Sequence, residues 1–322
     1  MTVLQTYESG RRRVNGFYYY VETFGDSAAP RPAVASSRLT TGSQRPTIAS
    51  QRSMNAAPRP VILFLHGFTG STASWNRLAS SVSHVARPIA IDQLGHGQSD
   101  APADPIRYGA GACADDVIAL LDVLEIDRAI LLGYSMGGRL AMHVADRHPD
   151  RLSALVLESA SPGISTPEER AARLASDEKL AQIAEREGIA AFVNRWEKVP
   201  LFDSLARLPQ EMRVALRAQR LSNRPRGLAG SLRGFGAAVP APLFDRLPLV
   251  TIPTQIIVGE LDTKYTEVGN DMVTRLPNAK MAVVPDAGHT VHLERPDQFA
   301  AILRRFILNR SVRSQSPASN AL

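Results

Sequence analysis

The sequence predicts an α/β protein, with a mostly parallel central sheet, helices on both faces and an inserted helical cap. Three observations predict it. Short apolar runs alternate with helical segments, one of these runs ends in a serine between glycines, and one long stretch has no strand signal. Wholly apolar strands are typical of parallel sheets, because helices cover both faces of such a sheet. With 322 residues, 44% of them hydrophobic, the chain can bury a large core.

The N-terminal region, residues 1–27, is expected to supply one strand region of the core. Residues 14–24 are rich in aromatic and β-branched side chains and predict a strand or a hairpin. Residues 28–60 are rich in Ala, Ser, Arg, Pro and Thr and have no helical or strand period. They predict a disordered insertion where a compact fold would have a short turn. The tail, residues 310–322, is also expected to be disordered.

The first part of the core, residues 61–162, begins with the fully apolar strand 61–65. Predicted strands and helices then alternate along the chain. The predicted strands are 88–91, 129–132 and 154–157, and the predicted helices are 75–83, 109–124 and 138–145.

Residues 163–247 then lose the strand signal, and helical segments replace it. This block predicts a cap inserted after the strand 154–157. The second part of the core, residues 248–309, returns to the alternating pattern. Its predicted strands are 254–258 and 281–284, and its predicted helices are 267–276 and 296–308.

Charge and cysteine content exclude several classes of function. The formal net charge is +6, but residues 28–60 and 310–322 hold seven arginines and no acidic residue, so the remaining chain is close to neutral. We therefore expect no nucleic-acid partner. The single cysteine, Cys113, cannot form a disulfide within the chain, which suits a reducing compartment.

Targeting and membrane signals are weak. Only a short apolar stretch, residues 17–21, follows the three arginines at 11–13, which argues against a signal peptide. No apolar run approaches the roughly 20 residues needed to cross a bilayer. We expect a cytoplasmic protein without stable membrane association, as a monomer or small homo-oligomer.

The strand 129–132 runs into Gly133-Tyr134-Ser135-Met136-Gly137, and a helix follows. A serine between glycines at a strand-to-helix turn is the pattern of a nucleophile elbow. The tight turn leaves no room for side chains on its flanks and lifts the serine oxygen above the sheet edge. Ser135 is therefore the predicted catalytic nucleophile.

A serine hydroxyl needs an imidazole to accept its proton, and the imidazole needs an acid to fix its tautomer. Asp262 and His289 each follow a predicted strand, so both lie at the sheet edge that carries Ser135. We predict that they complete the triad. The alternatives are His292 for the base, and Glu260, Asp271 or Glu158 for the acid.

The backbone N–H groups of Phe68 and Met136 are the predicted oxyanion hole, because these residues follow the first core strand and the nucleophile. His66 is expected to make a structural hydrogen bond, and the glycine-rich loop 92–99 to shape the site. No cluster of His, Cys or carboxylate residues has metal-ligand spacing, so we expect no metal and no cofactor.

Over about residues 14–25 and 61–309 the chain resembles the α/β-hydrolase fold family. Within it, the chain is most similar to the 2-succinyl-6-hydroxy-2,4-cyclohexadiene-1-carboxylate synthases of menaquinone biosynthesis. The motifs that carry this resemblance are His66-Gly67-Phe68-Thr69-Gly70-Ser71, the elbow with Gly138-Arg139, Glu158-Ser159-Ala160-Ser161-Pro162-Gly163, residues 168–173, Trp196 before Pro200-Leu201-Phe202, and residues 231–234. The insertion at 25–60 and the tail depart from the family and touch no motif.

The resemblance implies a carbon–oxygen lyase that removes a proton beside a succinyl carbonyl and expels pyruvate. The family's substrate carries three carboxylates, so arginines in the site are informative. Arg139 lies one helical turn after Ser135, on the same helix face. By resemblance, Arg173 and Arg217 of the cap face the substrate, and Trp196 and Tyr134 line its pocket. The other arginines of the cap and its flanks are expected to be solvated: Arg170, Arg213, Arg220, Arg224 and Arg226.

Two other functions remain open from the sequence. The same triad would serve a serine carboxylesterase or a carbon–carbon bond hydrolase with a different cap. The other possibility is a non-catalytic receptor of the same fold. The intact set of Ser135, Asp262 and His289 argues against this interpretation.

Overall fold

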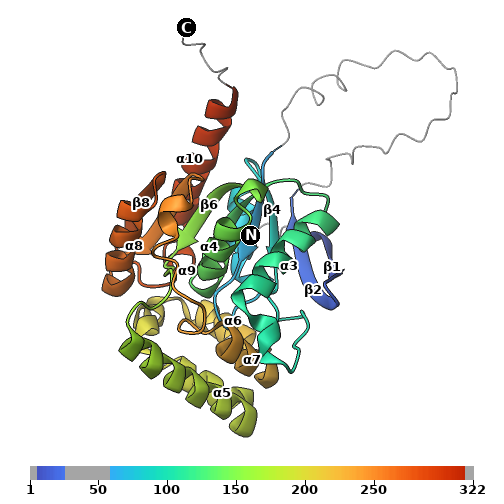
Figure 1. Cartoon of the computed structure of the whole chain (residues 1–322), viewed down its shortest axis with the longest axis vertical. Helices are drawn as coiled ribbons and strands as arrows, with labels where there is room; N and C mark the ends of the chain where they lie inside the picture. The colour runs from blue at the N-terminus through green and yellow to red at the C-terminus, as the bar shows by residue number, and fades with distance from the viewer. Residues whose placement is uncertain (1–5, 26–58, 316–322) are drawn as a thin grey trace, which may run out of the picture.

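The computed structural model describes residues 6–25 and 59–315. Its strands are β1 (Thr6–Val14), β2 (Phe17–Phe24), β3 (Val61–Leu65), β4 (Arg87–Ile91), β5 (Ala129–Tyr134), β6 (Leu152–Glu158), β7 (Thr254–Gly259) and β8 (Ala279–Val284). They form one eight-stranded sheet in the order β1-β2-β4-β3-β5-β6-β7-β8 (Figure 1). In this order the strands β4, β3, β5, β6, β7 and β8 pair in parallel, which confirms the predicted α/β class.

The helices of the core are α2 (Asn76–Val82), α3 (Ala110–Val123), α4 (Met136–Arg147), α8 (Thr263–Arg275), α9 (Val291–Glu294) and α10 (Pro296–Gln315). Short 3-10 helices join some of these elements: η1 (Thr72–Trp75), η2 (Pro105–Tyr108), η3 (Pro149–Arg151) and η5 (Leu247–Leu249). No helix among the residues that the structure describes is long and apolar enough to cross a membrane.

Alternating side chains of the strands divide the core into two layers. Leu63 and Leu65 of β3 face the layer that α3, α4 and α8 cover, whereas Ile62 and Phe64 face the layer of α2 and α10. Successive strand residues point to opposite faces, and here both faces are covered. The strand 61–65 is therefore apolar at every position, and this is why it could be predicted.

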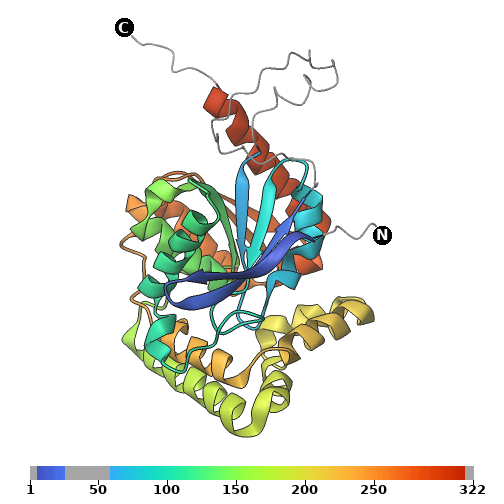
Figure 2. The ribbon, with the colours of Figure 1, turned by 90° about the vertical axis from the view of Figure 1, so that its right-hand side faces the viewer.

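The N-terminal region, for which the sequence predicted a strand or a hairpin, is a hairpin. Residues 14–24 include the turn of a hairpin rather than one continuous strand, because Asn15 and Gly16 both have positive φ, 48° and 90°. An Asn-Gly turn of this kind joins antiparallel strands tightly. The hairpin adds to the sheet through an antiparallel pairing of β2 with β4, so the sheet is mixed at this edge (Figure 2).

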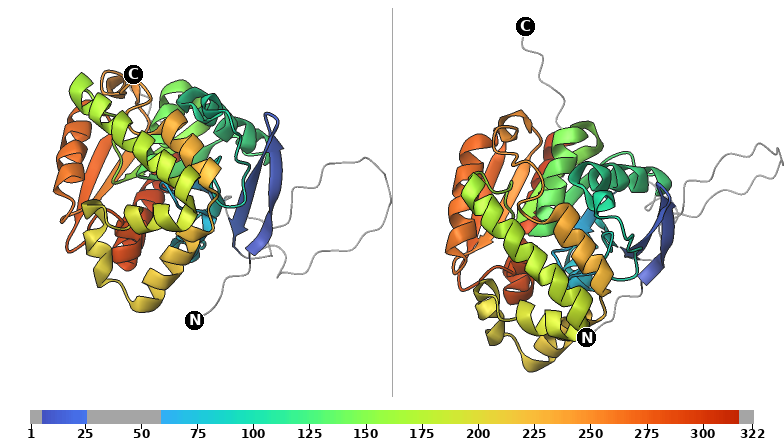
Figure 3. Two further views of the ribbon diagram at one scale, coloured as in Figure 1. Left: turned by 90° about the horizontal axis from the view of Figure 1, so that it is seen from below. Right: turned by 60° about the horizontal axis from the view of Figure 1, so that its bottom comes forward.

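The cap lies between β6 and β7 along the chain and covers one end of the sheet (Figure 3). It consists of α5 (Pro167–Trp196), η4 (Pro200–Arg207), α6 (Gln210–Leu221) and α7 (Pro225–Phe235). A non-helical Gly188, with φ 84° and ψ 176°, interrupts α5. The cap has a small core of its own, in which Phe192 of α5 packs with Leu228 and Leu232 of α7.

Two expected segments fall mostly outside the described residues. The predicted insertion, 28–60, lies outside them except for residues 59 and 60. α10 continues to Gln315, so residues 310–315 of the predicted tail are part of this helix. The sequence has no proline or glycine between Pro296 and Pro317, so no helix breaker stops α10 at residue 309. The remaining tail, residues 316–322, is not described.

Candidate active site

Ser135 lies between β5 and α4 in a strained backbone conformation, with φ 51° and ψ −109°. Its N–H donates to the carbonyl oxygen of Glu158 on the neighbouring strand, at 2.8 Å. A Cβ on Gly137 would lie 2.1 Å from the carbonyl oxygen of Leu65, so only glycine fits there. Such strain persists only where the surroundings enforce it, and it is concentrated at functional sites.

Ser135, His289 and Asp262 form a hydrogen-bonded chain. The Ser135 Oγ lies 3.0 Å from Nε2 of His289, and Nδ1 of His289 donates to Oδ2 of Asp262 at 2.6 Å. The three residues follow β5, β8 and β7, whose carboxyl ends meet at one edge of the sheet. The sequence predicted these three as the triad, and the structure brings them together with the geometry that a nucleophile and its base require.

The alternative acids and base have other partners. His292 directs its Nδ1 to the Glu158 carboxylate, at 2.8 and 2.9 Å. Glu260 accepts from the N–H of Asp286 at 3.1 Å, and Asp271 pairs with Arg275 of its own helix. None of these residues contacts His289 through a described hydrogen bond, and Asp262 is the candidate acid that bonds its ring.

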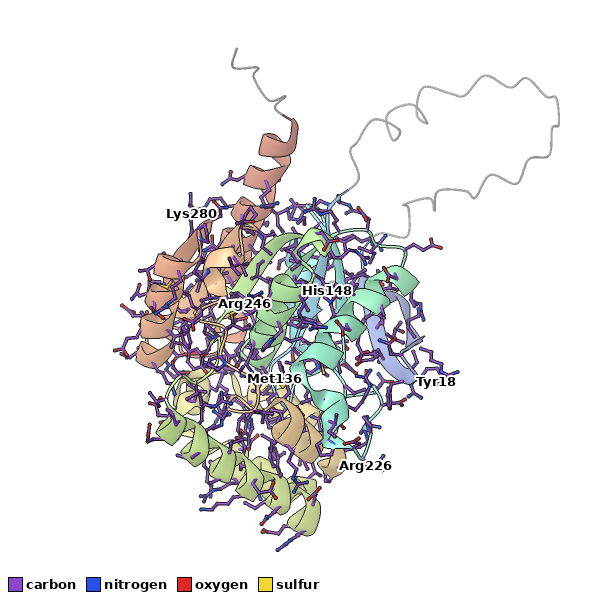
Figure 4. All side chains as sticks on the ribbon, viewed as in Figure 1. Tyr18, Met136, His148, Arg226, Arg246 and Lys280 are labelled. Atoms are coloured by element: carbon purple, nitrogen blue, oxygen red, sulfur yellow. The ribbon has the colours of Figure 1, made fainter. Side chains whose placement is uncertain are left out.

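The predicted oxyanion donors, Phe68 and Met136, belong to different elements beside Ser135. Met136 begins α4, where the sheet meets the cap (Figure 4), so its N–H has no acceptor within the helix. Phe68 lies in the loop after β3, and its ring packs edge-on against Trp196 and Phe192 of the cap. Both residues line the same cavity as Ser135. Their role as donors stays a prediction.

A cavity of about 250 Å³ lies between the sheet edge and the cap. Its apolar walls include the rings of Phe68, Tyr134, Trp196 and Phe202. Tyr134 packs against the His289 ring, with 5.4 Å between ring centroids, and shares a 2.8 Å hydrogen bond with Thr290. The predicted pocket residues Tyr134 and Trp196 therefore line the cavity that contains the serine.

Three arginines line this cavity: Arg139, Arg173 and Arg220. Arg139 is buried on α4, donates to the carbonyl oxygen of Phe235 at 2.7 Å and lies over the Phe235 ring. Burial lowers the pKa of Arg139 to about 10, so its guanidinium stays charged at neutral pH. It carries a positive charge close to the nucleophile, as its position in the sequence predicted.

Arg173 lies on α5 and forms an ion pair of 2.8 Å with Asp177, one helical turn later. Burial raises the pKa of Asp177, while Arg173 opposes that rise. Asp177 also lines the cavity, and its Oδ2 has no hydrogen-bond partner among the described residues. Only Nε of Arg173 donates to Asp177. The two terminal NH₂ groups of its guanidinium therefore remain available to an anionic ligand.

Arg217, which was predicted to face the substrate, does not line this cavity. Arg217 is outside the cavity, where it donates to Glu197 and to Oδ1 of Asn194. Arg220, which was expected to be solvated, is buried, lies over the Phe202 ring and pairs with Glu197 at 3.2 Å.

Helical spacing explains why Arg220 lines the cavity and Arg217 does not. Leu216, Gln219 and Arg220 all line the cavity, and spacings of three and four residues place them on one face of α6. Arg217 follows Leu216 by one residue and is rotated off that face. The apolar Leu216 was the signal in the sequence that could have identified Arg220.

The other cap arginines vary in exposure. Arg213 and Arg226 are exposed, and Arg224 is exposed but donates to the carbonyl oxygen of Ser99. Arg170 donates to the carbonyl oxygen of Pro240 at 2.9 Å.

His66 has a structural role in the loop after β3. Its Nδ1–H donates to the carbonyl oxygen of Gly67 at 2.8 Å, and its Nε2 accepts from the N–H of Gln93 at 2.9 Å. Burial lowers the pKa of His66 to about 4, which keeps the ring neutral. Asp92 of the glycine-rich loop accepts from the N–H groups of Thr72 and Gln98, both at 2.7 Å. These contacts join the loops that border the site.

Within residues 6–25 and 59–315 no group of three or more His, Cys, Asp or Glu residues could hold a metal ion. Comparison with protein families matches residues 60–296 to the alpha/beta hydrolase fold. This range includes the cap and every residue of the predicted triad.

Two relatives illustrate the closer similarities. A putative 2-succinyl-6-hydroxy-2,4-cyclohexadiene-1-carboxylate synthase of Bacillus subtilis is 42% identical over 246 residues, which are 76% of this chain and 89% of the relative. The synthase of that name from Serratia proteamaculans is 31% identical over 249 residues, 77% of this chain and 93% of the relative.

Solved structures agree with this similarity. The structure of MenH from S. aureus superimposes with a TM-score of 0.76 at 33% sequence identity, and the match covers 80% of this chain and 96% of that one. An enol-lactonase from Burkholderia xenovorans LB400 superimposes with a TM-score of 0.73 at 23% identity, which shows a shared fold only.

Proposed function

The chain belongs to the alpha/beta hydrolase fold family, on the branch of the 2-succinyl-6-hydroxy-2,4-cyclohexadiene-1-carboxylate synthases, and we propose that it catalyses that synthase reaction in menaquinone biosynthesis. The reaction converts 2-succinyl-5-enolpyruvyl-6-hydroxy-3-cyclohexene-1-carboxylate into 2-succinyl-6-hydroxy-2,4-cyclohexadiene-1-carboxylate and pyruvate. The enzyme is thus a lyase built on a hydrolase fold.

One observation carries the proposal beyond the fold. Three arginines line a largely apolar cavity that also contains the triad serine. Arg173 and Arg220 pair with Asp177 and Glu197, but all three arginines keep guanidinium N–H groups without a partner among the described residues. A neutral ester would gain little from these charged donors, whereas the carboxylates of an anionic substrate would accept from them. Charge-assisted contacts between arginine and carboxylate are strong where water is scarce. The cavity therefore favours a polycarboxylate substrate.

In the proposed mechanism His289 accepts the Ser135 proton, and the serine oxygen removes the proton beside the succinyl carbonyl. The electron pair of the broken C–H bond moves toward the carbonyl oxygen, where the N–H groups of Phe68 and Met136 would stabilise the enolate. Collapse of the enolate breaks the carbon–oxygen bond to the enolpyruvyl group. The leaving group takes up a proton and is released as pyruvate.

The test is pyruvate release from the cyclohexene substrate, followed by coupling to lactate dehydrogenase. We expect turnover that depends on Ser135, with slow hydrolysis of p-nitrophenyl acetate. Rapid hydrolysis of that ester without pyruvate release would instead identify a carboxylesterase or a carbon–carbon bond hydrolase. Binding of the substrate without either reaction would identify a receptor.

The proposal includes a cytoplasmic location and a small-molecule polycarboxylate as the partner of the site. The single cysteine suits the reducing cytoplasm, and the near-neutral charge of the chain outside its two arginine-rich segments argues against a nucleic-acid partner.

A further inference from the structure

The loop between β8 and α9, residues 285–290, carries His289, and one buried carboxylate holds its backbone. Glu294 of α9 accepts a hydrogen bond from the N–H of Gly288 at 2.8 Å. Its second oxygen accepts from the N–H of Thr290 at 3.1 Å. The residues immediately before and after His289 are therefore fixed by the same side chain, which is only 3% exposed.

Gly288 allows this close approach. A Cβ at this position would lie 3.2 Å from the Glu294 carboxylate and 2.1 Å from the hydroxyl of Ser204 in the cap. The carboxylate and the cap therefore pack directly against the loop backbone. Hydrogen bonds to an ionised carboxylate are roughly twice as strong as neutral ones, and burial strengthens them further.

Further contacts hold the same loop from the cap and from the elbow. Arg207 of η4 donates to the carbonyl oxygen of Asp286 at 3.1 Å and lies 3.9 Å from the Glu294 carboxylate. The Thr290 hydroxyl contacts the hydroxyl of Tyr134, the residue before the nucleophile. Glu294 is the group in this set that engages both N–H groups beside His289.

We propose that Glu294 is a positioning residue for proton transfer, which holds the backbone of His289 so that its Nε2 stays within reach of Ser135. The proposal rests on the use of the triad in the proposed function. Glu294 does not line the described catalytic cavity, so it acts through His289 rather than on the substrate. A displacement of about 1 Å at a reacting group can reduce a rate on the order of 100-fold.

The chain offers a matched control in Glu260. Its carboxylate also accepts from a backbone N–H of this loop, that of Asp286, at 3.1 Å. Glu260 is exposed, and its contact lies three residues before His289. Glu294→Gln and Glu260→Gln thus make the same change at two sites on one loop, of which only the first lies beside the histidine.

In Glu294→Gln, the amide NH₂ faces a backbone N–H that also donates, so one of the two hydrogen bonds is lost. We expect kcat for pyruvate release to fall on the order of 10- to 100-fold, with KM changed by less than about twofold. The rate at which a fluorophosphonate modifies Ser135 should fall by a similar factor. Glu260→Gln should leave both rates unchanged. The fluorophosphonate reaction needs no natural substrate, so it tests Glu294 even if the proposed function fails.

A second set of variants separates positioning from a general loss of structure. In a His289→Ala background, Glu294→Gln should cause no further loss of activity, because the residue that it positions is gone. An equal loss in both backgrounds, or wild-type rates in Glu294→Gln, would overturn the proposal.

If Glu294→Gln does not fold, Glu294→Asp provides the same measurement. It keeps the charge but shortens the side chain, and an intermediate loss is expected. Failure of both variants to fold would show a purely structural role instead and would also overturn the proposal.

Discussion

Asn223, in the turn between α6 and α7 of the cap, donates from Nδ2 to the carbonyl oxygen of Thr69, 2.9 Å away. Thr69 follows Phe68, the predicted oxyanion donor, and has a positive φ of 69°. The side-chain oxygen of Asn223 accepts from the N–H of Gly97 in a second core loop, at 3.1 Å. One buried amide therefore joins the cap to two loops of the core, the loop after β3 and the loop 92–99.

Replacement of Asn223 by alanine should loosen this junction. It leaves the Thr69 carbonyl and the Gly97 N–H without a partner, which typically costs about 1–3 kcal/mol of folding free energy. We also expect kcat/KM for pyruvate release to fall, because the Phe68 loop is less well held. Thermal denaturation and steady-state kinetics measure the two effects. The neighbouring Ser222→Ala removes only a local bond to Gln219 and is the control; equal behaviour of the two variants would contradict the prediction.

Arg220→Ala should lower kcat/KM for pyruvate release far more than Arg217→Ala. The first removes a charge from the cavity wall, which should weaken transition-state binding by roughly 2–4 kcal/mol, or on the order of 30- to 1000-fold. The second removes an ion pair outside the cavity. Arg186→Ala, at an exposed position of α5, is the reference for a cap arginine without a role. A larger loss in Arg217→Ala would restore the original assignment.

Ser135→Ala and His289→Ala should each lower turnover by several orders of magnitude, and the double variant should be no slower than either. Both residues take part in the same proton transfer, so the loss of either one abolishes it. The two reductions in turnover therefore do not add. A lyase mechanism also predicts that no acyl group accumulates on Ser135. Mass spectrometry of the enzyme during turnover checks this, and a covalent substrate adduct on Ser135 would support a hydrolase.

His143→Leu should make the protein relatively more stable in acid. Burial lowers the pKa of His143 to about 4, whereas an unfolded histidine titrates near 6.5. The unfolded state therefore binds the extra proton first, so the wild-type protein loses stability as the pH falls from 6.5 toward 4.

At pH 5.5 one such histidine lowers the free energy of unfolding of the wild-type protein by about 1.4 kcal/mol. His143→Leu lacks the imidazole and does not lose this stability. Denaturant unfolding at pH 7.5 and 5.5 measures the difference between variant and wild type. His84→Leu, which removes an imidazole from an exposed position, is the matched control. A constant difference between the two pH values for His143→Leu would rule out the depressed pKa.

The predicted triad shows what local sequence can reveal. Ser135, Asp262 and His289 each follow a strand of the parallel sheet, and such a sheet brings these strand ends together wherever they lie in the chain. The fold class follows from the same apolar runs. Both inferences need only the identity of strands, not the packing of side chains.

The cap arginines show where that approach ends. A helix face is determined by what it packs against, and the sequence does not state which face of α6 meets the core. Arg217 and Arg220 differ by less than one turn, yet only Arg220 reaches the cavity. Glu294 was missed for a similar reason, because its two acceptor bonds depend on the fold of the loop around His289.

The two ends of the cap are tied to each other where it leaves the sheet. The N–H of Leu243 donates to the carbonyl oxygen of Pro162 at 2.9 Å, and β6 and β7 are neighbours in the sheet. The cap is therefore an insertion whose two ends leave and re-enter the core at neighbouring positions. The entropic cost of closing such an insertion grows only slowly with its length. A cap of different length or sequence could replace this one with little penalty to the sheet. Evolution can thus exchange the substrate-selecting half of the site while the proton-transfer half stays unchanged.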